Sequence, residues 1–369
     1  MAKVPFHSDD PGRYEPQLHL NALPDLGSIK PRNPEVQGPD AGTGPHARAN
    51  VPAWVSSIEH LRTTLPHVES NAVMVAPTLT GGPHAVAAMG PQVGYYSPQI
   101  FSEYELHGGG IDSEGVTFPG AAPWPLIGHG IDFAWSGTSA NGDNQDTFVE
   151  RLCNPDGSPP SDDSSNYMYK GRCIPFQTRD QSVTTPVSPL DPTTPSQTIV
   201  YRTKRSVHGP VFAYATVRGA PVALSVAKAV DFHELSAAIP FMELSENQPT
   251  DVRSFMQVMG QFPGSENWFY VDRRDVGWIQ SGVYPKHAPH SNVDLPWWGD
   301  GRADWQCFNP TLYTACYIPA SHRPQAIDPP NGFIISWNNV EARSWHPPPT
   351  GWGTGPLDHA LILQQRLLW

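Results

Sequence analysis

Three short stretches of the sequence carry side chains able to do chemistry. A Ser–Asn pair at 70–71 precedes the apolar run AVMVAP, with no GxSxG elbow or other triad motif around it. The stretch GDNQDTFVE at 142–150 spaces acidic oxygens closely after a glycine, which suits either a hard cation such as Ca²⁺ or a simple acidic turn. The stretch WNN at 337–339 follows an apolar run, where an Asn amide either donates to a developing oxyanion or forms a turn.

The sequence gives little sign of a zinc hydrolase. The HExxH pattern is absent, and His107 and His129 form only an isolated pair. Most of the 15 histidines are therefore expected in loops or in packing roles.

The composition predicts strands, turns and long connections. The 369 residues suffice for one large or two ordinary domains, and they include 42 Pro, 32 Gly and 12 Trp. The Pro and Gly content argues against a helical bundle, and the aromatic content argues against wholesale disorder. The formal charge of −12 does not favour binding to nucleic acid or to an anionic membrane, since both are negatively charged.

The cysteines bear on the cellular compartment. They form two local pairs, Cys153 with Cys173 and Cys307 with Cys316, and neither pair has CxxC spacing. Disulfides are favoured over four unrelated thiols, and they require an oxidising compartment. Against this, the N-terminus shows no signal-peptide pattern, and no apolar run is long enough to predict a transmembrane span.

The elements that must position these residues are expected in two regions. Residues 1–69 read as a Pro-rich leader or spacer, largely irregular, with one possible helix at 55–65. From residue 70 to 369, strands and hairpins are predicted up to about 153 and again at 267–285, with loop-rich insertions near 154–198. Helices are predicted within 225–248, broken at Pro240, at 250–262 with Thr250 as the cap, and at 357–369.

Eight motifs, in chain order, resemble the penicillin acylases, which are N-terminal-nucleophile hydrolases. The resemblance runs over roughly residues 66–340 and implies an α+β fold, in which antiparallel sheets form a sandwich flanked by helices, with a β-rich insertion. The motifs are SNAV at 70–73, GPQVGYYSP at 90–98, ELHGGGID at 105–112, PGAAPWPLIGHG at 119–130, AWSGTSANGDNQDTFVERL at 134–152, VHGPV at 207–211, NWFYVD with GWIQSGVYP at 267–285, and GFIISWNN at 332–339.

This resemblance implies a nucleophile that needs no triad. In the family the precursor cuts itself before a Ser, and the freed α-amine, with a pKa near ~8, accepts the hydroxyl proton. The nucleophile falls on Ser70, released by scission of the Glu69–Ser70 bond. The oxyanion donors fall on the backbone N–H of Ser139 and the side chain of Asn338, and Gln92 matches a residue beside the nucleophile.

The resemblance also implies a structural calcium ion. Its ligands fall on the carboxylates of Asp143 and Asp146 and on the carbonyl of Gln145, with Val293 as a weaker carbonyl match. The family also has a calcium-binding carboxylate after the position of WNN, and Glu341 is only a poor match for it here.

An apolar acyl-side pocket is implied as well. It falls on Val93, Ile127 and Trp268, and such a lining selects a hydrophobic acyl group. His129 and His208 lie inside matched motifs and are interpreted as structural.

Two departures from the family pattern stand out. A family Arg in the closing helix falls on His359, unless Arg366 takes its role. The chain also has no counterpart of the upstream α chain, which supplies part of the acyl pocket and one calcium carboxylate. We therefore expect a fragment or a reduced relative, with the missing α-chain region as a possible partner.

The expected function is hydrolysis of a linear amide through an acyl-enzyme on Ser70. The alternative is a catalytically inactive fragment or scaffold remnant. Penicillin-type side chains, cephalosporin side chains and N-acyl-homoserine lactones are all handled by relatives, and Gln92 favours aryl- or alkyl-acyl amides of the penicillin kind. The predicted disulfides and the family's export suggest an extracellular or periplasmic location.

Overall fold

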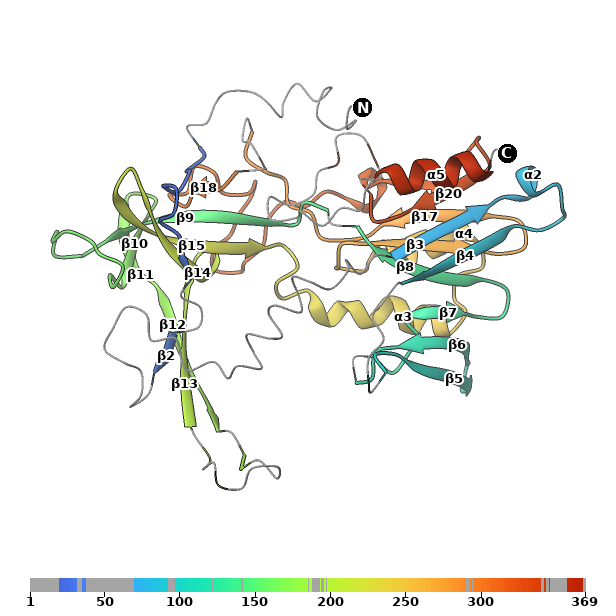
Figure 1. The fold of residues 1–369 in the computed structure, drawn as a ribbon, viewed down its shortest axis with the longest axis horizontal. Coiled ribbons are helices and arrows are strands. Elements are labelled where there is room, and N and C mark those ends of the chain that lie inside the picture. Colours follow the sequence, from blue (N-terminus) through green and yellow to red (C-terminus); the bar gives the residue numbers. More distant parts are fainter. Residues whose placement is uncertain are drawn as a thin grey trace.

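Three antiparallel sheets dominate the structure, and helices are few (Figure 1). This confirms the β-rich fold with antiparallel sheets that the sequence predicts. The computed structural model describes residues 20–31, 35–37, 70–91, 97, 99–120, 122–140, 142–184, 186–187, 193, 196, 198–289, 293, 295–339, 342, 345 and 357–367.

The largest sheet forms one end of the molecule, on the left of Figure 1. Its order is β11-β10-β9-β15-β14-β13-β12, with β1 on β14, β2 on β13, and β18 parallel to β9. The strands are β1 (Lys30–Pro31), β2 (Glu35–Gln37), β9 (Gln145–Cys153), β10 (Asn166–Tyr169), β11 (Arg172–Pro175), β12 (Gln177–Thr184), β13 (Thr198–Ser206), β14 (Gly209–Val217), β15 (Ala220–Lys228) and β18 (Trp297–Trp298).

Two further sheets lie at the other end and pack face to face. The seven-stranded sheet has the order β19-β17-β16-β8-β7-β6-β5, and the three-stranded sheet has the order β20-β3-β4. Their strands are β3 (Ser70–Val75), β4 (Val86–Pro91), β5 (Ser102–Gly108), β6 (Ile111–Thr117), β7 (Ile127–His129), β8 (Ala134–Ser139), β16 (Glu266–Val271), β17 (Val276–Gln280), β19 (Gln325–Ile327) and β20 (Phe333–Ser336).

Alternating burial along the strands produces this layering. In β3, Ala72 and Met74 are fully buried and pack with Phe269 of β16, so one core lies between the two sheets. Residues of opposite parity on β16, Trp268 and Tyr270, pack instead with α3 (Ala238–Ser245) and α4 (Val252–Met259). The helix α5 (Leu357–Leu367) contacts β20 on the outer side of the small sheet.

The helical predictions need two corrections. The stretch predicted as helical from 225 begins as the end of β15, because Ser225 and its neighbours pair with β9 in the sheet. The helix α3 follows a 3₁₀ turn, η1 (Glu234–Ala237), and Pro240 lies in its first turn, where no intrahelical N–H is needed, so Pro240 does not break it. The cap of α4 is Asp251, not Thr250, since Asp251 and Ser254 form a capping box.

The remaining short elements are α2 (Pro77–Thr80) and η2 (Ala320–His322). The C-terminal helix prediction is confirmed by α5, whereas the helix predicted at 55–65 lies outside the described residues. Part of the predicted leader belongs to the large sheet, through β1 and β2, and Ala22 is buried there. Among the described residues, no helix is both long and apolar enough to cross a membrane.

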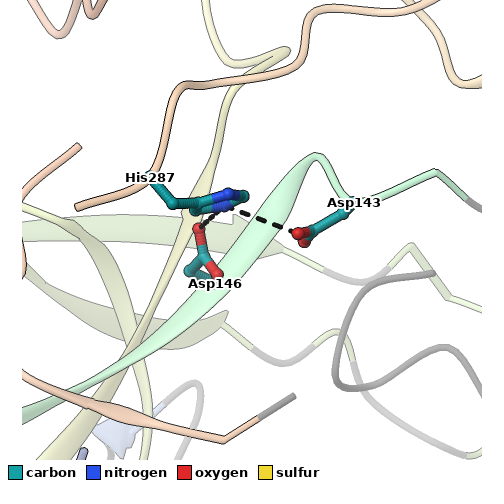
Figure 2. Close-up of side chains that lie close together, drawn as sticks. All are labelled: Asp143, Asp146 and His287. Atoms are coloured by element: carbon teal, nitrogen blue, oxygen red, sulfur yellow. Dashed lines mark hydrogen bonds and ion pairs between the residues drawn. The ribbon is translucent and has the colours of Figure 1, made fainter. Parts of the chain in front are cut away.

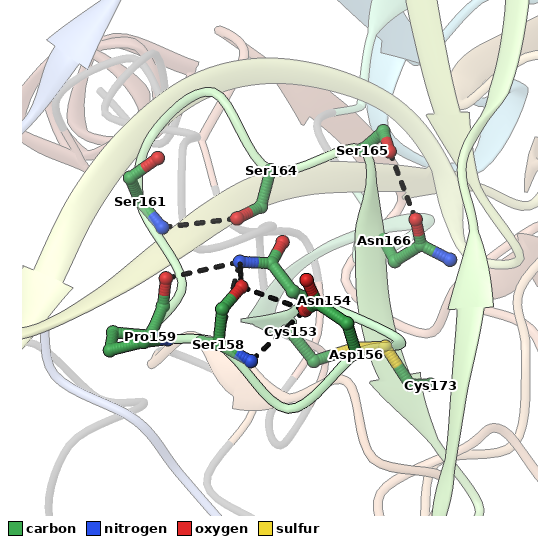
Figure 3. The surroundings of a disulfide bond; sticks show 10 residues. All are labelled: Cys153, Asn154, Asp156, Ser158, Pro159, Ser161, Ser164, Ser165, Asn166 and Cys173. Atoms are coloured by element: carbon green, nitrogen blue, oxygen red, sulfur yellow. Dashed lines mark hydrogen bonds between the residues drawn. A yellow bond between two sulfur atoms is a disulfide. The ribbon is translucent and has the colours of Figure 1, made fainter.

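Both predicted disulfides are present. Cys153 is bonded to Cys173 and Cys307 to Cys316. Figure 3 shows the first bond, which closes the loop between β9 and β11. Within that loop, the Asn154 side chain donates to the carbonyls of Ser158 and Pro159. The loop-rich segment at 154–165 is thus held by its own polar side chains, and the disulfide joins β9, which precedes it, to β11.

Candidate active site and cation loop

Ser70 is the first residue of β3, the central strand of the small sheet. It pairs with Pro91 of β4, and β20 lies on the other side of β3. The alternating burial of Ala72 and Met74 fixes the register of β3, because a shift by one residue would expose both side chains. The position of Ser70 at the strand end is therefore determined by the core behind it.

Asn338 lies two residues beyond β20 and meets Ser70 there. Its side-chain Oδ1 accepts a hydrogen bond from the Ser70 backbone N–H at 2.6 Å, and its Nδ2 donates to the Ser139 carbonyl at 2.9 Å. A donor on one side and an acceptor on the other fix the orientation of the amide. Asn338 is 6% exposed and has a left-handed backbone conformation with φ of 53°, which Asn tolerates better than most residues.

Ser139 is the last residue of β8, and β7 pairs only with Ala134 and Trp135 at the other end of this strand. The next residue, Ala140, donates its N–H to the Ser265 carbonyl, so Ser139 and Glu266 form the following pair without mutual hydrogen bonds. The N–H and the carbonyl of Ser139 therefore both point away from β16. They face the edge at which Asn338 reaches the carbonyl.

The structure thus brings together three of the predicted site residues. Ser70 is 268 residues from Asn338 in the sequence, and Asn338 is 199 residues from Ser139. The arrangement places two donors, the Ser139 N–H and the second Nδ2 hydrogen of Asn338, at the edge next to the Ser70 backbone. Two such donors near one serine are able to stabilise a developing oxyanion. Glu69, Gln92 and Val93 lie outside the described residues.

The other two predicted pocket residues, Trp268 and Ile127, lie on opposite faces of the seven-stranded sheet. Trp268 is 5% exposed, and its indole N–H donates to Ser281 Oγ at 3.0 Å. Its ring lies over Gly137, where a Cβ would come within 2.8 Å of the indole. Gly128 of β7 pairs with Trp135, which packs into the same helix-facing cluster as Trp268, so the neighbouring residue Ile127 faces the other side of the sheet.

Glu266 is a residue that sequence reasoning missed. It faces Ser139 across the β8–β16 pair, and it has the same parity on its strand as Trp268. Burial raises the pKa of the Glu266 carboxyl to about 8. An acidic residue directly before an apolar strand was the available signal, but only the strand register places it opposite Ser139.

The predicted cation loop lies at the start of β9, and a histidine joins it. Asp143 and Asp146 lie close to His287, whose Nε2 is 3.1 Å from Asp146 Oδ2 and 3.6 Å from Asp143 Oδ2 (Figure 2). Burial alone would lower the pKa of His287, but the two carboxylates outweigh it and raise the pKa to about 9. Trp305 also donates its indole N–H to Asp146 Oδ2 at 2.6 Å.

The local backbone directs one carbonyl of this loop away from β15. Ala229 donates to the Asn144 carbonyl, so the next pair, Gln145 with Lys228, leaves the Gln145 carbonyl pointing away from β15. Gly142 precedes the loop, and a Cβ there would lie 2.4 Å from the Tyr284 ring, so this tight approach requires glycine. Val293 packs in the neighbouring aromatic cluster.

The histidines of the matched motifs lie away from Ser70. His208 is buried in the large sheet between Glu150 Oε1 at 2.9 Å and Asp304 Oδ1 at 3.0 Å, with its ring stacked on Phe148. Burial lowers the pKa of His208, but the carboxylates outweigh this and raise it to about 9. His129 is exposed, with its Nε2 3.5 Å from Glu114.

The two residues that the family Arg could match both belong to α5. Arg366 is exposed in the last turn of α5. The backbone of His359 belongs to the same helix, whereas its side chain and Glu341 lie outside the described residues.

Comparison with known proteins gives consistent results. The model of the family named Penicillin amidase matches residues 14–361. The chain is 25% identical over 277 residues to penicillin G acylase of Escherichia coli, covering 75% of this chain and 29% of that protein. It is 26% identical over 222 residues to the acyl-homoserine lactone acylase QuiP of Pseudomonas putida, covering 60% and 24%.

A solved structure shares the fold. The thermostable penicillin G acylase of Alcaligenes faecalis superimposes with a TM-score of 0.66 at 23% identity, over 80% of this chain and 49% of that one. The chain therefore spans less than a third of the length of these two curated relatives and about half of the solved chain. Because the family match extends over most of its residues, this chain belongs to the penicillin amidase family.

Proposed function

We propose that this chain hydrolyses linear amides with Ser70 as an N-terminal nucleophile. Its family membership supports an acylase or amidase. The observation that carries the assignment to Ser70 is the pair of hydrogen bonds through Asn338, which joins the Ser70 N–H to the Ser139 carbonyl. These bonds support the proposal, because they connect the nitrogen that scission would free to both residues assigned as oxyanion donors. The layering of two sheets between helices supports the sandwich expected of such hydrolases.

The first step is scission of the Glu69–Ser70 peptide bond. It leaves Ser70 with a free α-amine, for which a pKa near ~8 is usual, so a large part of it is uncharged near neutral pH. The amine keeps its hydrogen bond to Asn338 Oδ1, and this bond holds it near its own hydroxyl. The uncharged amine then accepts the Oγ proton, directly or through one water.

The acyl transfer follows from this arrangement. Ser70 Oγ attacks the substrate carbonyl, and the oxyanion accepts hydrogen bonds from the Ser139 N–H and Asn338 Nδ2. The amine gives its proton to the leaving nitrogen as the carbon–nitrogen bond breaks, which forms an acyl-enzyme. A water molecule, deprotonated by the same amine, releases the acid and restores Ser70. Gln92 is assigned beside the nucleophile.

The acyl group is expected to be hydrophobic. Trp268 lies on the same strand pair as Ser139, and Val93 and Ile127 are assigned to this pocket from the family motifs. We assign the rest of the pocket to the α-chain region of the family, which acts as a partner if it is supplied separately. Among aryl-acyl, alkyl-acyl and homoserine-lactone amides, Gln92 favours the first two.

A divalent cation at the 142–146 loop would have a structural role. The candidate ligands are Asp143, Asp146 and the Gln145 carbonyl, with Val293 as a further carbonyl, and calcium is the ion that the resemblance predicts. A cation there would tie the start of β9 to neighbouring loops, and it would not touch the reacting atoms. The two disulfides favour an extracellular or periplasmic location.

Intact-mass measurement with N-terminal sequencing tests the nucleophile. The expressed chain should yield two polypeptides, residues 1–69 and 70–369, with Ser at the new N-terminus. A chain that remains whole would refute autocatalytic maturation and would favour the inactive remnant. Adding the α-chain region of a relative in trans tests whether the partner is required.

A matched pair of variants excludes a contaminating protease. Ser70→Ala should remain whole, because it lacks the attacking hydroxyl, whereas Ser102→Ala, on a strand of the other sheet, should be cut as the wild type is. Cleavage of Ser70→Ala at the same bond would assign the cut to another enzyme. The matured chain is then assayed with a chromogenic phenylacetyl arylamide and with an N-acyl-homoserine lactone.

A further inference from the structure

Ser265, the residue before β16, holds the backbone that follows Ser139 at two points. The Ser265 carbonyl accepts the Ala140 N–H at 3.2 Å, and the Ser265 Oγ accepts the Gly142 N–H at 2.7 Å. A single residue thus anchors the segment that leaves the candidate oxyanion donor, once through its main chain and once through its side chain.

The Ser265 hydroxyl is itself held by Tyr284. Their two oxygens are 2.8 Å apart, and Tyr284 is 1% exposed. Because the Tyr284 hydroxyl donates its one hydrogen to the Ser281 carbonyl at 2.6 Å, the Ser265 hydroxyl is the donor in the bond between them. The bonds therefore run in one direction, from the Gly142 N–H through Ser265 and Tyr284 to the Ser281 carbonyl. Hydrogen bonds aligned in this way strengthen one another.

The other end of this chain of bonds is fixed by β17. Gln280, the last residue of β17, is fully buried, and its Nε2 donates to the Tyr284 hydroxyl at 3.2 Å. Ser281 follows it, and its N–H donates to the Glu266 carbonyl at 2.8 Å. At Gly282 a Cβ would lie 2.6 Å from the Tyr284 ring, so the backbone packs directly against the phenol. The Tyr284 hydroxyl is therefore held by the sheet itself.

We propose that Tyr284 and Ser265 are positioning residues for the oxyanion donor of Ser139. This inference rests on the proposed function, in which the Ser139 N–H stabilises the oxyanion. Ser139 and Glu266 form a pair without mutual hydrogen bonds, so the strand ladder does not hold this N–H, and the anchors at Ala140 and Gly142 fix it instead. Both side chains act through the backbone, and neither is assigned a contact with the substrate.

Tyr284→Phe tests the role of the hydroxyl, because it keeps the ring. Misplacing a group by ~1 Å relative to the reacting atoms costs up to about 10²-fold in rate. We expect kcat for a phenylacetyl arylamide to fall about 10- to 100-fold with KM within about twofold of wild type, since the displaced donor serves the transition state. Ser265→Ala should give a similar loss. Ser265→Thr, which retains a hydroxyl, should recover kcat to within about threefold of wild type.

Tyr313→Phe is the matched control. Tyr313 is also buried, and its hydroxyl donates at 2.6 Å to a backbone carbonyl, that of His208, between β13 and β14 of the large sheet. This variant should lower the urea midpoint about as Tyr284→Phe does, but it should leave kcat unchanged. Equal losses of kcat in the two variants, a loss in Tyr284→Phe that lies wholly in KM, or a kcat of Tyr284→Phe within about threefold of wild type would overturn the proposal.

Hydrogen exchange separates this inference from the proposed function. Mass spectrometry of the Ser70→Ala chain follows the peptide that contains residues 139–142, with a peptide from β14 as the internal reference. Adding Tyr284→Phe should speed exchange of the 139–142 peptide by about tenfold or more relative to the reference, whereas adding Tyr313→Phe should not. If the wild type is never cut and hydrolyses no amide, the proposed function fails, and the exchange result still decides whether these side chains hold the segment. Exchange that Tyr284→Phe leaves unchanged would refute the positioning role even in an active enzyme.

Discussion

Replacing Asn338 by glycine tests the site at its most connected residue. The Asn338 side chain holds the Ser70 N–H and the Ser139 carbonyl, and we assign its remaining Nδ2 hydrogen to the oxyanion. Glycine is the appropriate substitution because φ at this position is 53°, a conformation that glycine adopts without strain. Asn338→Gly therefore removes the amide and keeps the backbone.

Two magnitudes follow from the structure. Loss of one oxyanion donor lowers kcat by about 10²–10³, or about 2.7–4 kcal/mol. Loss of two hydrogen bonds at a residue that is 6% exposed leaves partners unsatisfied, and each costs roughly 1–3 kcal/mol of the free energy of unfolding. Asn338→Ala should lose the same kcat but be less stable than Asn338→Gly by a further ~1 kcal/mol, because alanine is strained at positive φ.

The assay separates these effects. The fraction of chain cut at Ser70, kcat and KM for a phenylacetyl arylamide, and the urea midpoint are measured for wild type, Asn338→Gly and Asn338→Ala. We expect kcat to fall with KM nearly constant in both variants. A glycine variant whose kcat stays within about threefold of wild type, or whose loss lies wholly in KM, would refute the role given to Asn338.

Three further predictions concern charge and covalent bonds. The pKa of His208 is raised to about 9 from 6.5, so its contribution to the free energy of unfolding is complete below pH 6.5 and is lost as pH rises through 9. Urea unfolding measured across this pH range should show a loss of roughly 3 kcal/mol, and a free energy of unfolding that does not change with pH would contradict this. Glu266, with a pKa raised to about 8, should ionise beside the oxyanion site and depress kcat/KM above pH 8. Glu266→Gln should abolish this fall of kcat/KM at high pH, and identical pH profiles of kcat/KM for the wild type and the variant would contradict the prediction. Replacing Cys153 and Cys173 by serine should lower the free energy of unfolding by about 3 kcal/mol in urea titrations, and an unchanged midpoint would disprove the estimate.

The fold could be predicted from the sequence where periodicity is local. The strand around Ala72 and Met74 and the apolar side of α4 follow directly from residue pattern. The same reasoning failed at 225–228, the first part of the stretch predicted as helical, where small residues that are compatible with a helix are held as a strand by pairing with β9. Pairing with a distant strand overrides local preference, and no local pattern reports it.

The candidate site shows the same division. Ser70, Ser139 and Asn338 could be named in advance because each lies in a motif that resembles the family's. His287 and Glu266 could not be named in advance. His287 is an isolated histidine in a loop, and only loop packing brings it to the Asp143–Asp146 pair. Glu266 begins a strand, and only the strand register brings it opposite Ser139. The face on which Ile127 lies is likewise a matter of register, since Gly128 pairs with Trp135, which faces the helices.

By itself, the sequence determined the β-rich class, both disulfides and the motifs that carry the candidate chemistry, because these depend on residue type and short-range spacing. Only the tertiary structure decided which of those residues meet. Ser70 reaches Asn338 across 268 residues because β20 pairs with β3, and Ser139 faces the same edge because its pair with Glu266 is a non-hydrogen-bonded one. Contacts of this kind depend on strand order and on register, which the burial of the whole core sets.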